Sequence, residues 1–157
     1  MKVLGIDPGS RRIGYGIIEQ GAKPRLIDAG LIPIAASTDA PALVELRNRL
    51  HELMELHKPN LVGVERLFFT KNRTTGIAVG QARGVILECI ESHGITIAEL
   101  TPNEVKQGVT GSGNADKQAV AKMVRLILGA HDLKLVDDAM DALAIALVTA
   151  QRARMSN

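Results

Sequence analysis

The chain has 157 residues, of which 46% are apolar and 23% are charged, a balance typical of one compact domain with a single core. Its 19 basic and 17 acidic side chains leave a net charge of +2, which excludes a highly charged disordered tail. The single cysteine excludes a disulfide framework and a thiolate zinc site. No apolar stretch reaches the roughly 18–20 residues of a membrane span, and no export signal precedes the first apolar run. We expect a soluble, cytoplasmic protein with one domain over residues 1–157 and no membrane partner.

Short apolar runs bounded by turn residues predict five strands. They cover residues 2–7, 12–19, 25–32, 60–65 and 95–100. The connections among the first three runs are short, so we expect these strands to be antiparallel neighbours. Apolar residues at helical spacing predict five helices, with Asn114 as the N-cap of the fourth. They cover residues 40–57, 74–92, 102–108, 115–128 and 137–154. This order predicts an α/β fold, a mixed sheet flanked by helices.

Carboxylates close two of the apolar strands, with Asp7 at the end of the first and Glu65 at the end of the fourth. One such acid has a plain explanation, because strands commonly end in polar turn residues. Two acids at neighbouring strand ends favour a functional site, since ligand sites in α/β sheets cluster at strand ends. Carboxylates gathered there repel each other, and a divalent cation such as Mg²⁺ relieves that repulsion.

The last predicted helix begins with further acids in an otherwise apolar sequence. Asp138 and Asp141 are three residues apart and Asp137 and Asp141 are four apart, so either pair shares a helix face. Favourable interaction with the helix dipole explains acids in the first turn but explains Asp141 poorly. Spacing alone leaves Asp137 and Asp138 as alternatives. Acids from two strand ends and one helix suit phosphoryl transfer by two metal ions about 3.5–4 Å apart.

Basic residues are concentrated in two segments that flank these acids. Residues 66–87 contain no acid and carry Arg66, Lys71, Arg73 and Arg83. Residues 105–130 carry Lys106, Lys117, Lys122 and Arg125 against a single acid, Asp116. A basic segment is often simply a solvated surface, but two of them beside an acidic cluster favour binding to nucleic-acid phosphates.

Two of the three aromatic residues, Phe68 and Phe69, directly follow the strand that ends in Glu65. Neighbouring side chains in an extended segment point in opposite directions, so we expect one ring to pack inward and the other to face DNA. The four histidines show no spacing typical of metal ligands, and we interpret them as surface or helix-end residues. They are His51, His57, His93 and His131.

The helix over residues 74–92 is apolar on most sides, which predicts burial all round. Gly76, Gly80 and Gly84 recur every four residues and form a smooth stripe along it. The stripe has two interpretations, close packing on the protein's own sheet or a dimer interface. We favour the dimer interface.

Five motifs are spread along the whole chain. They are GIDPGSRRIGYG at 5–16, VERLFFTKN at 64–72, GQARG at 80–84, VKQGVTGSGNADK at 105–117 and DDAMDALAIA at 137–146. With these motifs the chain strongly resembles the RuvC family of Holliday-junction resolvases. The resemblance implies an RNase H-like fold with a five-stranded sheet. It also implies a homodimer that binds four-way DNA junctions and nicks two opposing strands symmetrically, with two Mg²⁺ or Mn²⁺ ions per active site.

The same resemblance assigns roles to individual residues. The family's four catalytic acids fall on Asp7, Glu65, Asp138 and Asp141, which selects Asp138 over Asp137. Its basic residues for catalysis or phosphate contact fall on Lys106 and Lys117, and its base-stacking aromatic falls on Phe68. A role in recombination and DNA repair is implied, with the RuvA–RuvB branch-migration complex as partner.

Three other functions compete with this interpretation. The DPGS segment also resembles the phosphate loop of actin-like sugar kinases and chaperone ATPases, but those need two such domains. A junction-binding scaffold without catalysis is disfavoured because all four acids are present. An RNase H-like nuclease that acts in RNA processing is the nearest rival, and the DDAMDALA helix and Phe68 count against it.

Overall fold

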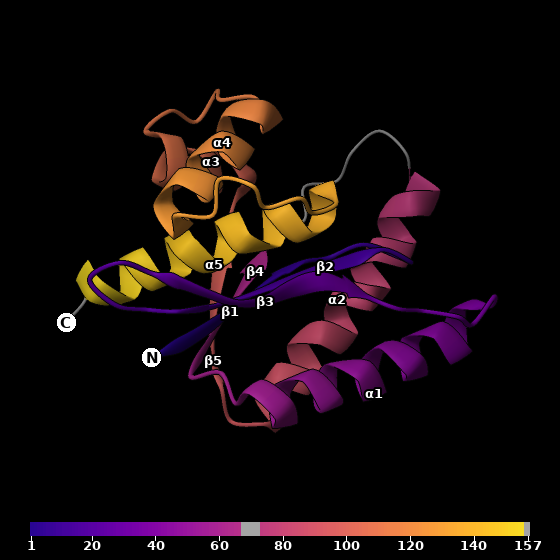
Figure 1. Cartoon of the computed structure of the whole chain (residues 1–157). Coiled ribbons are helices and arrows are strands. Elements are labelled where there is room, and N and C mark those ends of the chain that lie inside the picture. The colour runs from indigo at the N-terminus through magenta and orange to yellow at the C-terminus, as the bar shows by residue number, and fades with distance from the viewer. Residues whose placement is uncertain (67–72, 156–157) are drawn as a thin grey trace.

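The computed structural model describes residues 1–66 and 73–155, with the side chains of residues 73–75 left aside. The described part contains five strands and five helices (Figure 1). The strands are β1 (Lys2–Asp7), β2 (Ile13–Glu19), β3 (Arg25–Ile32), β4 (Leu61–Glu65) and β5 (Thr96–Leu100). The helices are α1 (Asp39–His57), α2 (Arg73–Ser92), α3 (Pro102–Thr110), α4 (Lys117–Leu128) and α5 (Asp137–Met155). All ten elements were predicted from the sequence, with boundaries within two residues.

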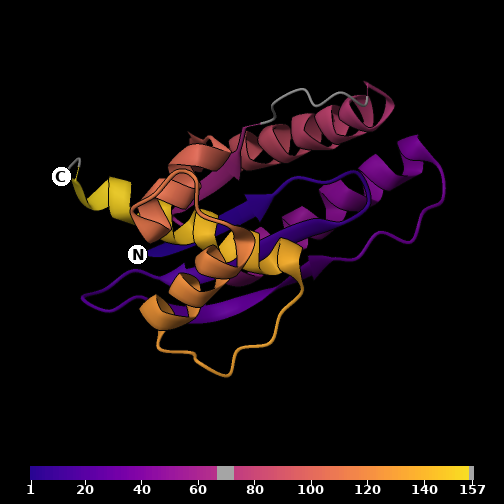
Figure 2. The same cartoon turned by 90° about the horizontal axis from the view of Figure 1, so that it is seen from above.

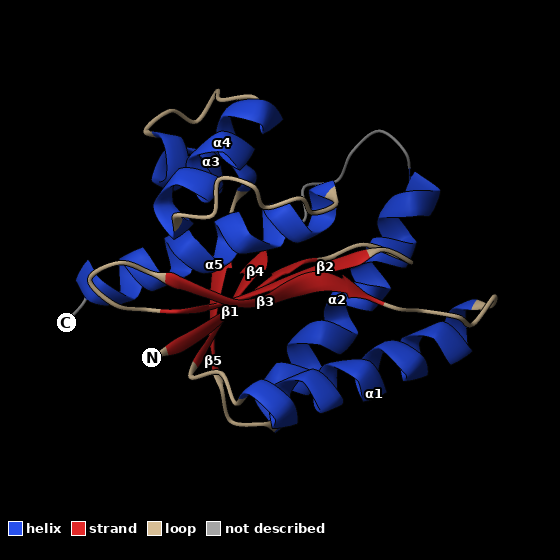
Figure 3. Ribbon diagram, in the orientation of Figure 1, coloured by secondary structure: helices blue, strands red, loops and turns tan. Residues whose placement is uncertain are grey.

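The five strands form one mixed sheet in the order β3-β2-β1-β4-β5 (Figure 3). β1, β2 and β3 pair antiparallel, as their short connections predict. β4 pairs parallel with β1, and β5 pairs parallel with β4, because a helix separates each of them from the strand before it. The predicted mixed sheet flanked by helices is therefore confirmed.

Helices cover both faces of the sheet. α5 lies directly on one face with α3 and α4 outside it, and α1 and α2 cover the other face (Figures 1 and 2). Successive side chains of a strand point to opposite faces of the sheet and pack into two separate cores. Val3 and Ile18 pack with α3, α4 and α5, whereas Leu4 and Ile17 pack with α1 and α2. Because helices cover both faces of the sheet, side chains that point to either face are apolar. The central strands are therefore continuous apolar runs in the sequence.

α5 packs unusually close to the sheet because glycines face it. A Cβ atom at Gly5 would collide with the backbone of Ala142 and Ala146, and one at Gly14 would collide with the carbonyl of Asp138. Gly63 likewise leaves room for Thr149. The side chains of α5 from Ala139 to Ala150, apart from Asp141, are buried as a result. The close approach brings the first turns of α5 against the ends of β1 and β2.

Two details differ from the sequence-based expectations. The N-cap of α4 is Asp116, whose side chain accepts a hydrogen bond from the backbone N–H of Ala119 at 2.7 Å, so the prediction of Asn114 is wrong. α2 is also not buried all round. Ala82 and Ile86 are buried against the sheet, but Ile77 is 63% exposed and nothing lies within 4 Å of a Cβ placed at Gly80 or Gly84.

Within residues 1–66 and 73–155, no helix is long and apolar enough to cross a membrane.

Candidate active site

The register of two parallel strands places Asp7 beside Glu65. Ile6 pairs with Val64, so the residues that follow them occupy equivalent positions at the same edge of the sheet. Side chains alternate along a strand, and Gly5 and Gly63 both face α5. Asp7 and Glu65 lie two residues further on and therefore also point to the α5 face.

α5 brings two more carboxylates to the same place. Asp138 and Asp141 lie in its first two turns, on the side of the helix that contacts the sheet through Ala142. A pocket of about 310 Å³ is lined by all six residues that the sequence and the family resemblance propose for catalysis. They are Asp7, Glu65, Asp138, Asp141, Lys106 and Lys117. Asp137 is exposed and is not among the lining residues.

Three carboxyl groups of this pocket, those of Asp7, Glu65 and Asp141, have raised pKa values. Burial, together with the charges of Glu65, Asp141 and Asp138, raises the pKa of Asp7 to about 7. Burial and the charge of Asp141 raise the pKa of Glu65 to about 6. Burial also raises the pKa of Asp141, although Lys117 opposes this shift. Three carboxyl groups thus share a partly desolvated site, in which ionising one raises the cost of ionising the next.

Two lysines approach this acidic group from different helices. Lys117 begins α4, and its Nζ lies 3.4 Å from Oδ2 of Asp141. The negative charge of Asp141 raises the pKa of Lys117, so the lysine stays protonated. Lys106, on α3, lines the pocket on the same side. The capping box that Thr101 and Glu104 form at the start of α3 fixes that helix relative to the end of β5.

Arg12 is a site residue that the sequence reasoning missed. Its Nε and Nη2 lie 2.9 and 2.8 Å from Oδ2 of Asp138, although the arginine side chain itself is 65% exposed. The pair forms because the loop between β1 and β2 passes the first turn of α5. The basic pair directly after the Asp-Pro-Gly turn was the available signal. Asp138 therefore already has a cationic partner within the protein.

The predicted DNA contacts fall into three groups. Phe68 and Lys71 lie outside the described residues, and so does the side chain of Arg73. Arg66 and Lys122 are exposed, which leaves their side chains accessible to DNA.

Arg83, the third case, is half-buried and paired within the protein. It forms an ion pair with Glu99 and its Nε lies 3.4 Å from the backbone carbonyl of Glu65. The DNA contact expected of Arg83 stays a prediction. Within the protein, its guanidinium contacts the end of β4, which carries Glu65.

The donor set of the pocket fits divalent cations. Four carboxylates supply the hard oxygen ligands that Mg²⁺ and Mn²⁺ favour, and neither a thiol nor an imidazole lines the pocket. The raised pKa values of Asp7 and Glu65 reflect burial first, and then the negative charge of neighbouring carboxylates. A bound cation would compensate that negative charge.

Comparisons with known proteins identify the family of the chain. The family model "Crossover junction endodeoxyribonuclease RuvC" matches residues 3–149. Proteins of that name from Caldicellulosiruptor saccharolyticus and Chloroflexus aggregans are 45% and 44% identical to the chain. The alignments cover 94% and 98% of this chain and 90% and 94% of theirs.

This chain belongs to the RuvC family.

Solved structures extend the comparison from sequence to fold. The structure titled "T. thermophilus RuvC in complex with Holliday junction substrate" superposes with a TM-score of 0.92 and 35% identity, over 99% of this chain and 96% of that one. The yeast mitochondrial Holliday junction resolvase superposes with a TM-score of 0.70 at 18% identity, over 98% of this chain and 81% of that one, and shows the shared fold alone. The RNase H-like fold expected of a RuvC family member is thereby confirmed.

Proposed function

We propose that this protein is a metal-dependent endodeoxyribonuclease that resolves four-way DNA junctions by paired, symmetric nicks in recombination and repair. One observation carries the proposal: a single pocket, in a RuvC family chain, gathers four carboxylates and two lysines. Membership of a family named for crossover junction cleavage supports the reaction. The relative whose structure is titled as a complex with a Holliday junction supports the substrate.

Asp7, Glu65, Asp138 and Asp141 would hold two Mg²⁺ or Mn²⁺ ions. Such ions, when bound, supply an activated water and stabilise the leaving oxygen of the cleaved phosphodiester. The protein's own groups orient and neutralise the substrate. Lys117 and Lys106 would balance the negative charge of the scissile phosphate. Arg12 would leave Asp138 for a neighbouring phosphate as DNA enters.

Other residues would bind the DNA outside the pocket. Arg66 directly follows Glu65 and Lys122 lies on α4; both are exposed and suited to phosphate contacts. Lys71 and Arg73 belong to the same basic segment as Arg66. Phe68 would stack on a base at the open centre of the junction, an interaction worth about 1–3 kcal/mol per base.

A second copy of the chain supplies the second active site that symmetric nicking requires. The exposed side of α2, with Ile77, Gly80 and Gly84, is an apolar and smooth surface that nothing else in the described chain covers. A C₂ pairing of two such surfaces would form a homodimer. The RuvA–RuvB complex is the expected partner that would drive branch migration on the same junction.

The proposal is tested with a synthetic four-way junction labelled on each strand in turn. Purified protein is incubated with Mg²⁺, with Mn²⁺ or with EDTA, beside a linear duplex of the same sequence. We expect paired nicks on opposing strands with either metal and none with EDTA or on the duplex. Tight junction binding without nicks would contradict the catalytic proposal, and equal cleavage of the duplex would contradict junction selectivity.

A further inference from the structure

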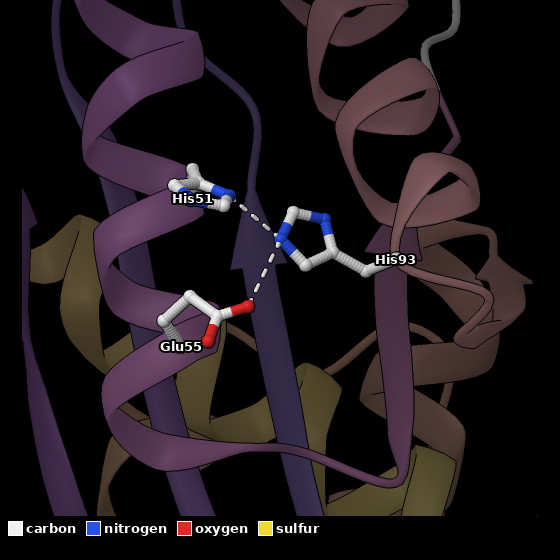
Figure 4. A group of neighbouring side chains, drawn as sticks. All are labelled: His51, Glu55 and His93. Atoms are coloured by element: carbon white, nitrogen blue, oxygen red, sulfur yellow. Dashed lines mark hydrogen bonds and ion pairs between the residues drawn. The ribbon is translucent and has the colours of Figure 1, made fainter.

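Two histidines and a glutamate meet on the helical layer formed by α1 and α2. His51 and Glu55 are one turn apart on α1, and His93 directly follows α2. His51 Nδ1 lies 2.8 Å from His93 Nε2, and Glu55 Oε1 lies 3.8 Å from the same nitrogen (Figure 4). The three potential ligand atoms all lie within 4.8 Å of one another. His51 is exposed and His93 lies at a helix end, as the sequence predicts, but the sequence spacing did not indicate that the two side chains meet.

The orientation of the His93 ring is fixed by the protein. Its Nδ1 lies 2.7 Å from the backbone carbonyl of Cys89. A carbonyl can only accept, so the hydrogen of the neutral ring sits on Nδ1 and the lone pair of Nε2 points into the cluster. A backbone carbonyl behind a histidine ring is the usual outer partner of a metal-ligating imidazole. The His93 side chain is 15% exposed, which restricts its movement further.

We propose that His51, Glu55 and His93 form a Zn²⁺ site. Two imidazole nitrogens and one carboxylate oxygen are a recurring zinc ligand set, with water in the fourth position. Imidazole nitrogens also discriminate against Mg²⁺, which favours oxygen ligands. Tetrahedral zinc separates two imidazole nitrogens by about 3.3 Å, so His51 has to withdraw by about half an ångström. His51 and Glu55 are exposed and free to make this adjustment.

The zinc site is distinct from the nuclease pocket. α2 runs back from the carboxyl end of β4, where Glu65 lies, to the amino end of β5. His93 therefore lies at the opposite end of the strands from the four acids. The ion would join α1 to α2 at positions 42 residues apart in the chain. It would stabilise the native state, because the unfolded chain does not present the three ligands together.

The test is a calorimetric titration of the full chain with Zn²⁺, in the presence of a large excess of Mg²⁺ to occupy the carboxylate pocket. We expect one zinc ion per chain for the wild type and for His131→Gln, an exposed histidine outside the cluster. His51→Gln and His93→Gln should each bind zinc at least tenfold more weakly. Thermal unfolding with Mg²⁺ alone checks that the variants fold, and added Zn²⁺ should raise the Tm of only the wild type and His131→Gln.

A second measurement identifies the ligands directly. Cu²⁺ prefers the same nitrogen ligands, and its electron paramagnetic resonance spectrum carries hyperfine structure from each bound imidazole nitrogen. We expect two such nitrogens in the wild type and one in His51→Gln. Zinc binding of equal strength in the wild type and both cluster variants, or no binding to the wild type, would overturn the proposal.

Discussion

Burial raises the pKa values of two proposed metal ligands, Asp7 and Glu65. The pKa of Asp7 is raised to about 7 and that of Glu65 to about 6, chiefly because both groups are partly removed from water next to other carboxylates. Near neutral pH, protons and divalent cations therefore compete for the same oxygen atoms.

This competition predicts a pH-dependent metal requirement. Lowering the pH from 8 to 6 passes through the raised pKa of Asp7, and should weaken the apparent affinity for Mg²⁺ about tenfold. The measurement is the Mg²⁺ concentration that gives half-maximal junction cleavage at each pH. A Mg²⁺ requirement that stays constant from pH 8 to 6 would contradict the assignment of Asp7 as a ligand.

The same shift predicts that Asp7→Asn stabilises the metal-free protein. In the unfolded chain Asp7 has its ordinary pKa of 3.8, whereas in the native state burial and neighbouring carboxylates raise its pKa to about 7. Between these values the native state binds more protons than the unfolded state, so stability falls as pH rises. At pH 8 in EDTA we expect Asp7→Asn to raise the Tm by about 2–8 °C, for about 1–2 kcal/mol of relieved repulsion. The gain should shrink toward pH 4, and a lower Tm at pH 8 would contradict it.

The sequence predicts some site residues better than others. Asp7 and Glu65 end buried strands, so a local pattern marks them. Arg12 and the zinc cluster depend on contacts between segments far apart in the chain, 126 residues for Arg12 with Asp138 and 42 for His51 with His93. The spacing of residues within a short segment does not reveal such contacts. Only the family motif selected Asp138 over Asp137, since both positions suit the start of a helix.

At the scale of elements, the position of α5 decides where two of the four acids lie. Glycines on β1, β2 and β4 let the helix backbone touch the sheet. Gly5 contacts the turn of α5 that follows Asp141, between Ala142 and Ala146. A side chain at Gly5 would push this part of the helix away from Asp7.

Gly5→Ala should therefore reduce both stability and activity. Its Cβ meets backbone atoms that cannot rotate away, and overpacking of this kind costs about 1–3 kcal/mol. Chemical denaturation measures the loss, and junction cleavage should fall because α5 moves relative to β1. Gly113→Ala is the matched control, since its Cβ comes no closer than 3.7 Å to other atoms. Equal stability of the two variants would contradict the role of the glycine contacts.

The ten elements could be predicted from the sequence because they follow apolar runs or helical spacing between turn residues. Their ends were less predictable. Asn114 and Asp116 are both favourable N-cap residues, so the sequence does not show which of them precedes the helix. In the structure α4 begins directly after Asp116. The exposure of one side of α2 was not predictable either. The apolar pattern in the sequence of a helix is the same whether its own chain or a second copy covers the helix.

At the scale of the whole molecule, the proposed symmetric nicking requires two copies of the chain. Each copy has one pocket with four carboxylates, and symmetric nicking needs two pockets held in a fixed relation. The exposed glycine side of α2 is on the layer opposite α3 and α4 (Figure 1). Changes there should alter assembly without altering the pocket.

Gly84→Arg should convert the dimer to a monomer. The long charged side chain finds open space in the isolated chain but would clash in a closely packed α2 interface. Light scattering measures the mass, and circular dichroism checks the fold. Leu126→Arg, an exposed site on α4 at the other face of the sheet, should remain dimeric. A wild-type monomer, or a Gly84→Arg dimer, would contradict the proposed interface.

The most direct test of the central claim compares Asp138→Asn with Asp137→Asn in the cleavage of a four-way junction with Mg²⁺. The two residues are adjacent at the start of α5, but only Asp138 lines the pocket. We predict that Asp138→Asn lowers the cleavage rate at least 100-fold, the order of effect seen when one stabilising group is removed from an active site, and still binds the junction. Asp137→Asn should cleave at close to the wild-type rate. Full activity in Asp138→Asn, or an equal loss in both variants, would contradict the account.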